Sequence, residues 1–147
     1  MYKSLFLLLA LWLGAAGRSA QAQTLSPLGI WTNADKKATY EIYKCGDKLC
    51  GKIVTLTVPT DPATGKPKLD AKNPEPSLRS HPLLGLVFMQ GFEYDDNNKW
   101  DDGKIYNPEE GKTYSCYLKL ESANTMEVKG YIGFSLIGKS QTWTRVK

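Results

Sequence analysis

The C-terminal stretch, residues 140–147, reads SQTWTRVK and places Trp143 two residues before Arg145. Large aromatic and guanidinium side chains lose much freedom when they are ordered near a chain end, so other residues must hold them. A second tryptophan, Trp31, lies in the GIW segment at residues 29–31. If the first and last strands of a sheet meet, Arg145 can stack on Trp31 and donate to backbone carbonyls. The two segments therefore predict a sheet that is closed by Gly29, Trp31 and Arg145.

The rest of the chain is typical of an all-β protein. Runs rich in Val, Ile, Thr, Tyr and Phe alternate with turn clusters, and hardly any segment has apolar residues at helical spacing. Most connections are short, which favours antiparallel pairing of consecutive strands. Such an up-and-down order most simply forms a closed eight-stranded antiparallel β-barrel, with an open sandwich as the alternative. The expected strands are residues 29–33, 38–45, 50–58, 84–94, 103–107, 112–120, 126–134 and 140–146.

One connection is long and rich in proline. Residues 59–82 contain six prolines and few apolar side chains. Because proline cannot donate to a sheet ladder, we expect this segment to be a surface loop with at most one helical turn, near residues 77–80. A loop of this length is often a lid or a binding loop. A wrapper that lies along the barrel wall is the equally open alternative.

The N-terminus has the features of a secretory signal. Lys3 precedes an apolar run at residues 5–13, and small residues end the segment at Ala20-Gln21-Ala22. We therefore expect residues 1–22 to be a cleaved signal peptide, and residues 23–147 to be one domain in the periplasm or outside the cell, with no integral membrane span. Removal of Lys3 and Arg18 would lower the net charge from +4 to +2. Basic residues alternate with acidic ones, so we expect no nucleic-acid partner.

The three cysteines are expected to have two different roles. Cys45 and Cys50 bracket GDKL between two β-like runs, so they would face each other across a four-residue hairpin loop and form a disulfide. Cys116 is then left over. It alternates with Tyr114 and Leu118 on the expected inner face, where a cysteine acts as a small hydrophobic residue.

Strand alternation also nominates the side chains of the barrel interior. A barrel of this size can hold one small ligand or be filled by its own side chains, and the sequence leaves both possibilities open. Met126 and Phe134 share the expected inner face. The candidate ligand-binding residues are Tyr40, Ile42, Ile53, Phe88, Phe92, Tyr114, Cys116, Leu118, Val128 and Ile132.

The sequence contains no recognisable catalytic constellation. The single histidine, His81, has no serine or cysteine beside it in a nucleophile context. Glu109 and Glu110 are adjacent in an NPEEG turn and would point apart, and the DDNNKWDDG segment lacks the ligand order of a calcium loop. We therefore expect a protein that is not an enzyme and has neither a cofactor nor a metal.

Several segments together resemble a known bacterial family. A G-x-W on the first strand with an arginine on the last resembles the calycin superfamily, the lipocalins and their relatives. A closer resemblance, to the bacterial domain-of-unknown-function 2147 family (DUF2147), implies a secreted lipocalin-like β-barrel of unassigned activity. It covers nearly all of the chain after residue 22 and is carried by GIW, LCGKIV, LDAKNP, PLLGL, WDDGKIYNPEEGKTYSC and VKGYIGFSLIGKSQTWTR, in this order.

Two functional hypotheses follow from these features. The first is a secreted or periplasmic barrel, a monomer, that binds a small apolar or amphipathic molecule such as a fatty acid or a lipid-like compound. The second is a non-catalytic interaction or structural domain of the cell envelope with a packed interior and an unidentified protein partner. The sequence does not identify the ligand.

Overall fold

A computed structural model of the chain describes residues 25–146. The predicted signal peptide lies outside the described residues, so its cleavage and the domain boundary at residue 23 stay predictions. Within the described part, no helix has the length and apolar composition needed to cross a membrane. The elements are β1 (Gly29–Thr32), β2 (Ala38–Cys45), β3 (Lys48–Leu56), η1 (Pro76–Leu78), β4 (Val87–Tyr94), β5 (Lys99–Asn107), β6 (Lys112–Ser122), β7 (Thr125–Tyr131) and β8 (Gly138–Arg145).

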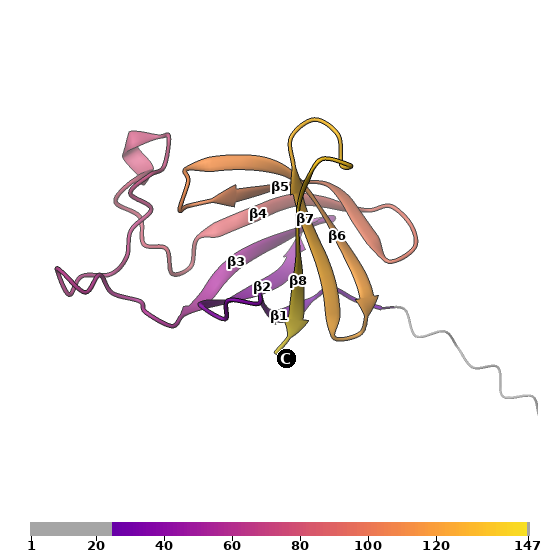
Figure 1. Ribbon diagram of the computed structural model, residues 1–147, viewed down its shortest axis with the longest axis horizontal. Helices are drawn as coiled ribbons and strands as arrows, with labels where there is room; N and C mark the ends of the chain where they lie inside the picture. The colour runs from indigo at the N-terminus through magenta and orange to yellow at the C-terminus, as the bar shows by residue number, and fades with distance from the viewer. Residues whose placement is uncertain (1–24, 147) are drawn as a thin grey trace, which may run out of the picture.

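The eight strands form a closed antiparallel barrel in up-and-down order (Figure 1). Each strand pairs with its neighbour in the sequence, and β1 pairs with β8, where Trp31 lies opposite Arg145. The predicted barrel is therefore confirmed, and the sandwich alternative is wrong. Because consecutive strands run in opposite directions, loops 33–37, 57–86, 108–111 and 132–137 lie at one end, which we call the open end. The tight turns lie at the other, the closed end.

The closed end is held together by Arg145. Its guanidinium carbon lies 4.2 Å from the centre of the Trp31 ring. Its Nε donates to the carbonyl of Ala123 at 2.7 Å, and its two terminal nitrogens donate to the carbonyls of Leu28 and Ser26, each at 2.6 Å. The Trp31 indole donates to the carbonyl of Pro27 at 2.8 Å. One side chain thus ties the last strand to the first strand, to the segment before it and to the β6–β7 turn.

Apolar side chains fill the half of the interior nearer the closed end. Among the buried residues are Trp31, Met89, Phe92, Cys116, Leu118 and Met126. Gly103 shows how tightly this region is packed, because a Cβ at that position would lie 2.2 Å from the Phe92 ring. The ring therefore occupies the space that any larger residue on β5 would need.

The fifth and seventh strands differ from the sequence prediction. β5 begins at Lys99 instead of residue 103, and a register shift between Trp100 and Gly103 turns Trp100 into the core. Pairing of β7 with β8 ends at Tyr131 opposite Gly138, so residues 132–137 leave the sheet. Ile132 and Phe134 are consequently 76% and 78% exposed, and their predicted inward orientation is wrong.

The predicted disulfide is present, although its hairpin is tighter than expected. Cys45 and Cys50 are bonded, with their Cα atoms 5.7 Å apart. The turn has two residues, Gly46 and Asp47, instead of four, because β3 already begins at Lys48. Cys45 pairs with Lys48 and Cys50 pairs with Tyr43, so the bond runs diagonally across the ladder.

The long β3–β4 connection is fixed to the barrel by a buried polar network. Asp70 is 1% exposed and accepts hydrogen bonds from the Tyr106 hydroxyl and from the Asn73 amide, both at 2.7 Å. Burial, followed by this contact with Asp70, raises the pKa of Tyr106 to about 12. The Lys72 ammonium donates to the carbonyl of Glu109 in the β5–β6 turn at 2.7 Å. These contacts are those of a wrapper rather than of a free lid.

Candidate binding site at the open end of the barrel

The predicted ligand-binding residues fall into three groups in the structure. Tyr40 and Tyr114 are half-buried. Ile132 is exposed on the β7–β8 loop. The remaining residues are buried in the core; they are Ile42, Ile53, Phe88, Phe92, Cys116, Leu118 and Val128. The open end is therefore the part of the interior that a ligand could reach.

Three aromatic rings form the floor of the open end. The Tyr40 ring stacks on Trp143 with 4.5 Å between ring centres, and it lies 5.1 Å from Phe88. Tyr40 and Phe88 come from the ends of β2 and β4 that are nearest the open end. Burial raises the pKa of Tyr40, and the negative charges of Asp35 and Glu109 add to this effect.

The inner wall above this floor is more polar and includes a glycine. Directly opposed residues of antiparallel strands share a face, so Gln141 and Lys139 lie on the same face as Val128 and Gly130. Both side chains are exposed, and the Gln141 amide oxygen accepts a hydrogen bond of 3.3 Å from the Trp143 indole. Gly130 presents no side chain, and a Cβ there would lie 3.6 Å from Ile105, an ordinary contact. The open end thus combines an aromatic floor with a polar rim.

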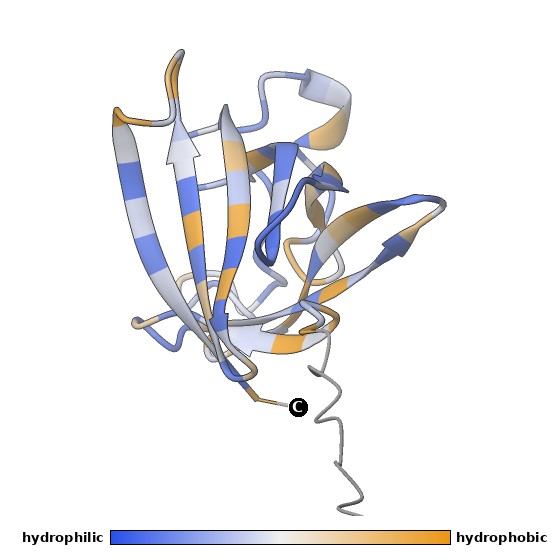
Figure 2. Cartoon of the chain, turned by 90° about the vertical axis from the view of Figure 1, so that its right-hand side faces the viewer, coloured by the Kyte–Doolittle hydropathy of each residue, from blue (hydrophilic) through white to orange (hydrophobic). Residues whose placement is uncertain are grey.

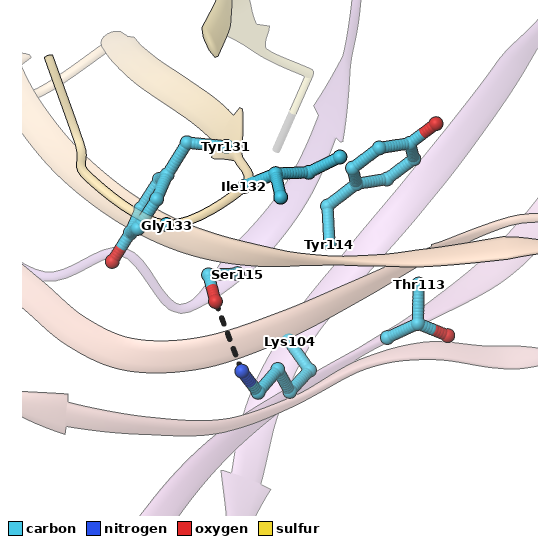
Figure 3. Close-up of a pocket in the computed structure, with 7 residues that line it drawn as sticks. All are labelled: Lys104, Thr113, Tyr114, Ser115, Tyr131, Ile132 and Gly133. Atoms are coloured by element: carbon cyan, nitrogen blue, oxygen red, sulfur yellow. Dashed lines mark hydrogen bonds between the residues drawn. The ribbon is translucent and has the colours of Figure 1, made fainter. Parts of the chain in front are cut away.

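A shallow hollow of about 210 Å³ lies beside the β7–β8 loop (Figure 3). Lys104 crosses it and donates to the Ser115 hydroxyl at 2.9 Å, while Ile132 and Tyr131 form the opposite side. A second hollow, of about 220 Å³, is acidic and is lined by Glu93, Tyr94, Asp95, Asp101 and Asp102. Both are smaller than the pockets of about 300–1,000 Å³ that enclose drug-sized ligands. A ligand at either hollow would therefore remain partly exposed.

The described residues show no arrangement suited to metal binding. Within residues 25–146, no group of three or more His, Cys, Asp or Glu side chains could hold a metal ion. Asp101, from the acidic segment considered for calcium, instead forms an ion pair with Lys99. Burial raises the pKa of the Cys116 thiol to about 12, which disfavours the reactive thiolate.

Sequence reasoning missed two features of this end of the barrel. Trp143 is not among the predicted interior residues, yet it supports the aromatic floor. Its pairing with Met126 across β7 and β8 could have revealed this, since Met126 was already placed on the inner face. Residues 132–134 of the exposed apolar loop 132–137 are predicted as the end of the strand 126–134, because their apolar side chains alternate as in a strand.

Comparisons with known proteins agree with this architecture. The fold is similar to a solved structure described as "Protein HP1028 from the human pathogen Helicobacter pylori belongs to the lipocalin family", with a TM-score of 0.73 and 26% sequence identity. The similarity covers 84% of this chain and 85% of that chain. No curated protein matches the chain. The model of the family described as "Uncharacterized protein conserved in bacteria (DUF2147)" matches residues 29–145, and the chain therefore belongs to this family of lipocalin-like barrels.

Proposed function

We propose that the barrel binds one small amphipathic molecule, such as a fatty acid or a lipid-like compound, at its open end. The apolar part of the ligand lies on the Tyr40 ring, and its polar group reaches Gln141 and Lys139. One observation carries the proposal. A half-buried aromatic ring, stacked on a buried tryptophan, faces an open end whose inner wall lacks a side chain at Gly130.

Two further observations support this function. Eight-stranded barrels commonly hold one small ligand, and the solved structure similar to this chain is described as a lipocalin. The proposal includes export through the predicted signal peptide, action in the periplasm or outside the cell, and a monomeric, non-catalytic protein. The disulfide between Cys45 and Cys50 is of a kind that persists in such compartments.

The test uses a substitution that adds a side chain to this wall. Gly130→Val adds volume on the inner face at a position where a Cβ meets only ordinary contacts. Thr142→Val is the matched control, because Thr142 lies exposed on the outer face of the neighbouring strand. Oleate binding is measured by isothermal titration calorimetry. We expect Gly130→Val to weaken binding at least tenfold, or about 1.4 kcal/mol, and Thr142→Val to leave it unchanged.

The packed closed half favours a second candidate function, a non-catalytic interaction or structural domain. Phe92 against Gly103 leaves no space for a ligand at that level of the barrel. If neither oleate nor an apolar fluorescent probe binds the wild-type protein, and native mass spectrometry finds no co-purified molecule, this second function is the correct one. Equal oleate binding by wild type and Gly130→Val would place the ligand elsewhere and contradict the proposed site.

A further inference from the structure

The β7–β8 loop exposes a cluster of apolar side chains that the rest of the chain leaves uncovered. Ile132, Phe134, Leu136 and Ile137 are 76%, 78%, 91% and 71% exposed, and we call these four residues the apolar tip. The loop reads IGFSLI and contains no charged residue. Isolated exposed apolar residues are common, whereas four within six consecutive positions mark an interaction site.

The backbone holds the apolar tip away from the core. The ladder ends at Tyr131 opposite Gly138, and Gly133 adopts a positive φ of 75°. A hydrogen bond of 3.0 Å from the amide of Ile137 to the carbonyl of Phe134 closes the turn. Figures 1 and 2 show the loop projecting at the top of the barrel, with hydrophobic colour at its end. The apolar side chains are thus already displayed in an outward orientation.

Basic side chains surround the base of the loop. Lys129 precedes it and exposed Lys139 follows it, on strands that pair with each other. Lys104 lines the same hollow as Ile132 and donates to a serine hydroxyl rather than to a carboxylate. The ion pairs found within residues 25–146 use other lysines: Lys48, Lys52 and Lys99. Three acids are also near: Glu110 accepts a hydrogen bond from the Tyr114 hydroxyl, Glu127 accepts one from the Ser140 hydroxyl, and Asp101 accepts one from the Tyr131 hydroxyl.

The opposite end of the barrel has no comparable apolar cluster. The closed-end turns at residues 46–47, 95–98 and 123–124 contain only Gly, Asp, Asn and Ala. Both ends carry basic and acidic residues, since Lys48, Lys99 and Arg145 lie at the closed end. The apolar tip, rather than charge alone, therefore distinguishes the two ends.

We propose that the apolar tip inserts into the interfacial region of an anionic lipid surface, with Lys104, Lys129 and Lys139 facing the lipid phosphates. Insertion of this kind gains strength from buried apolar area together with attraction to anionic headgroups, and a few side chains suffice for reversible binding. A stable protein interface instead needs roughly 1,000 Å² or more of buried surface, which a single hairpin tip does not provide. The proposal shares only Lys139 with the proposed ligand site, because Lys104 and Lys129 lie on the outer face of the sheet.

The test is co-sedimentation of the purified protein with lipid vesicles. One set of vesicles is phosphatidylcholine alone, and the other also contains phosphatidylglycerol. Mass spectrometry first establishes the N-terminus, since an uncleaved apolar run at residues 5–13 would itself bind lipid. We expect binding to the anionic vesicles that weakens with salt, and weaker binding to the neutral ones.

Three variants assign the binding to the loop. Phe134→Ser combined with Leu136→Ser removes two exposed side chains and is expected to lower the partition coefficient at least about tenfold. Leu84→Ser is the matched control, because Leu84 is also exposed at the open end but precedes β4, across the barrel from β7 and β8. It should leave partitioning unchanged. Lys129→Gln should reduce binding to anionic vesicles about fivefold and have little effect on neutral ones, and it leaves Lys139 of the ligand site unchanged.

Phe134→Trp reports directly on how deeply the apolar tip inserts into the lipid. Trp31, Trp100 and Trp143 are buried, so in protein that lacks residues 1–22, and with them Trp12, quenching by brominated lipid should be confined to the added indole. Four results would overturn the proposal: no binding to anionic vesicles, binding that the double serine variant retains, an equal loss in Leu84→Ser, or no quenching of the added indole. Self-association that the double serine variant abolishes, measured by sedimentation velocity without lipid, would assign the tip to a second copy of the chain and overturn it as well.

Discussion

Arg145 offers the sharpest test of the barrel closure. Its removal eliminates the contact with the Trp31 ring at 4.2 Å, which contributes about 0.5–2 kcal/mol in comparable pairs. It also removes the donors to three carbonyls. The Ala123 and Ser26 carbonyls are exposed and can bind water, whereas the partly buried Leu28 carbonyl loses its partner at a cost of about 1–3 kcal/mol. We therefore expect Arg145→Ala to lower the free energy of unfolding by about 2–4 kcal/mol.

Lysine should restore little of this stability. An ammonium has neither the planar face that stacks on Trp31 nor the fork that reaches the carbonyls of Leu28 and Ser26 together. Burial lowers the pKa of Arg145, so part of the gain from these contacts is already offset by desolvation. Because of this offset, we expect Arg145→Ala to lower the free energy of unfolding by an amount nearer the lower end of the range.

Urea unfolding followed by circular dichroism provides the assay. A double-mutant cycle of Arg145→Ala with Trp31→Phe should show a coupling energy of at least about 0.5 kcal/mol, because the two side chains are in contact. Strictly additive effects, or full stability in Arg145→Lys, would refute the role of the stacked guanidinium in closure.

Three further predictions concern the interior and the long loop. Gly103→Ala should destabilise the fold by about 1–3 kcal/mol in urea unfolding, because its Cβ would lie 2.2 Å from the Phe92 ring. Gly130→Ala should be tolerated, because a Cβ there meets only ordinary contacts. Equal destabilisation by the two substitutions would contradict the packing around Phe92. Cys116 should react with Ellman's reagent only after unfolding, since the thiol is buried and its pKa is raised to about 12; rapid reaction of the native protein would mean that the core opens. The pKa of Tyr106 rises from 10.0 to about 12, so the stability that its protonated hydroxyl contributes is complete below pH 10 and is lost as the pH rises toward 12. Tyr106→Phe should flatten the plot of unfolding free energy against pH in this range. An unchanged slope would contradict the role of the Tyr106 hydroxyl.

Strand number, order and closure could be predicted because they depend on local signals. Alternating apolar residues and short polar turns define the strands, and Trp31 with Arg145 indicates which strands meet. One local signal was misleading. The polar segment before Gly103 has the composition of a loop, yet Asp102 adopts a positive φ of 58° at the register shift and Trp100 turns into the core.

The remaining features depend on contacts between distant residues. Asp70 is buried because the Tyr106 hydroxyl, 36 positions away, donates to it, and no local pattern announces such a pair. The apolar residues at 132–137 resemble a strand until the partner residues on β8 are known. Function is further removed from the sequence, because one fold can present different ligand sites.

Binding at the open end is tested most directly by two of the indole signals in an NMR titration with oleate. The Trp143 indole donates to Gln141 beside the proposed site, whereas Trp100 lies in the core at the closed-end start of β5. We predict that oleate shifts the Trp143 indole resonance and the Gly130 amide in a saturable manner and leaves the Trp100 indole unchanged. A shift of Trp100 without Trp143, or no shift of either, would contradict binding at the open end.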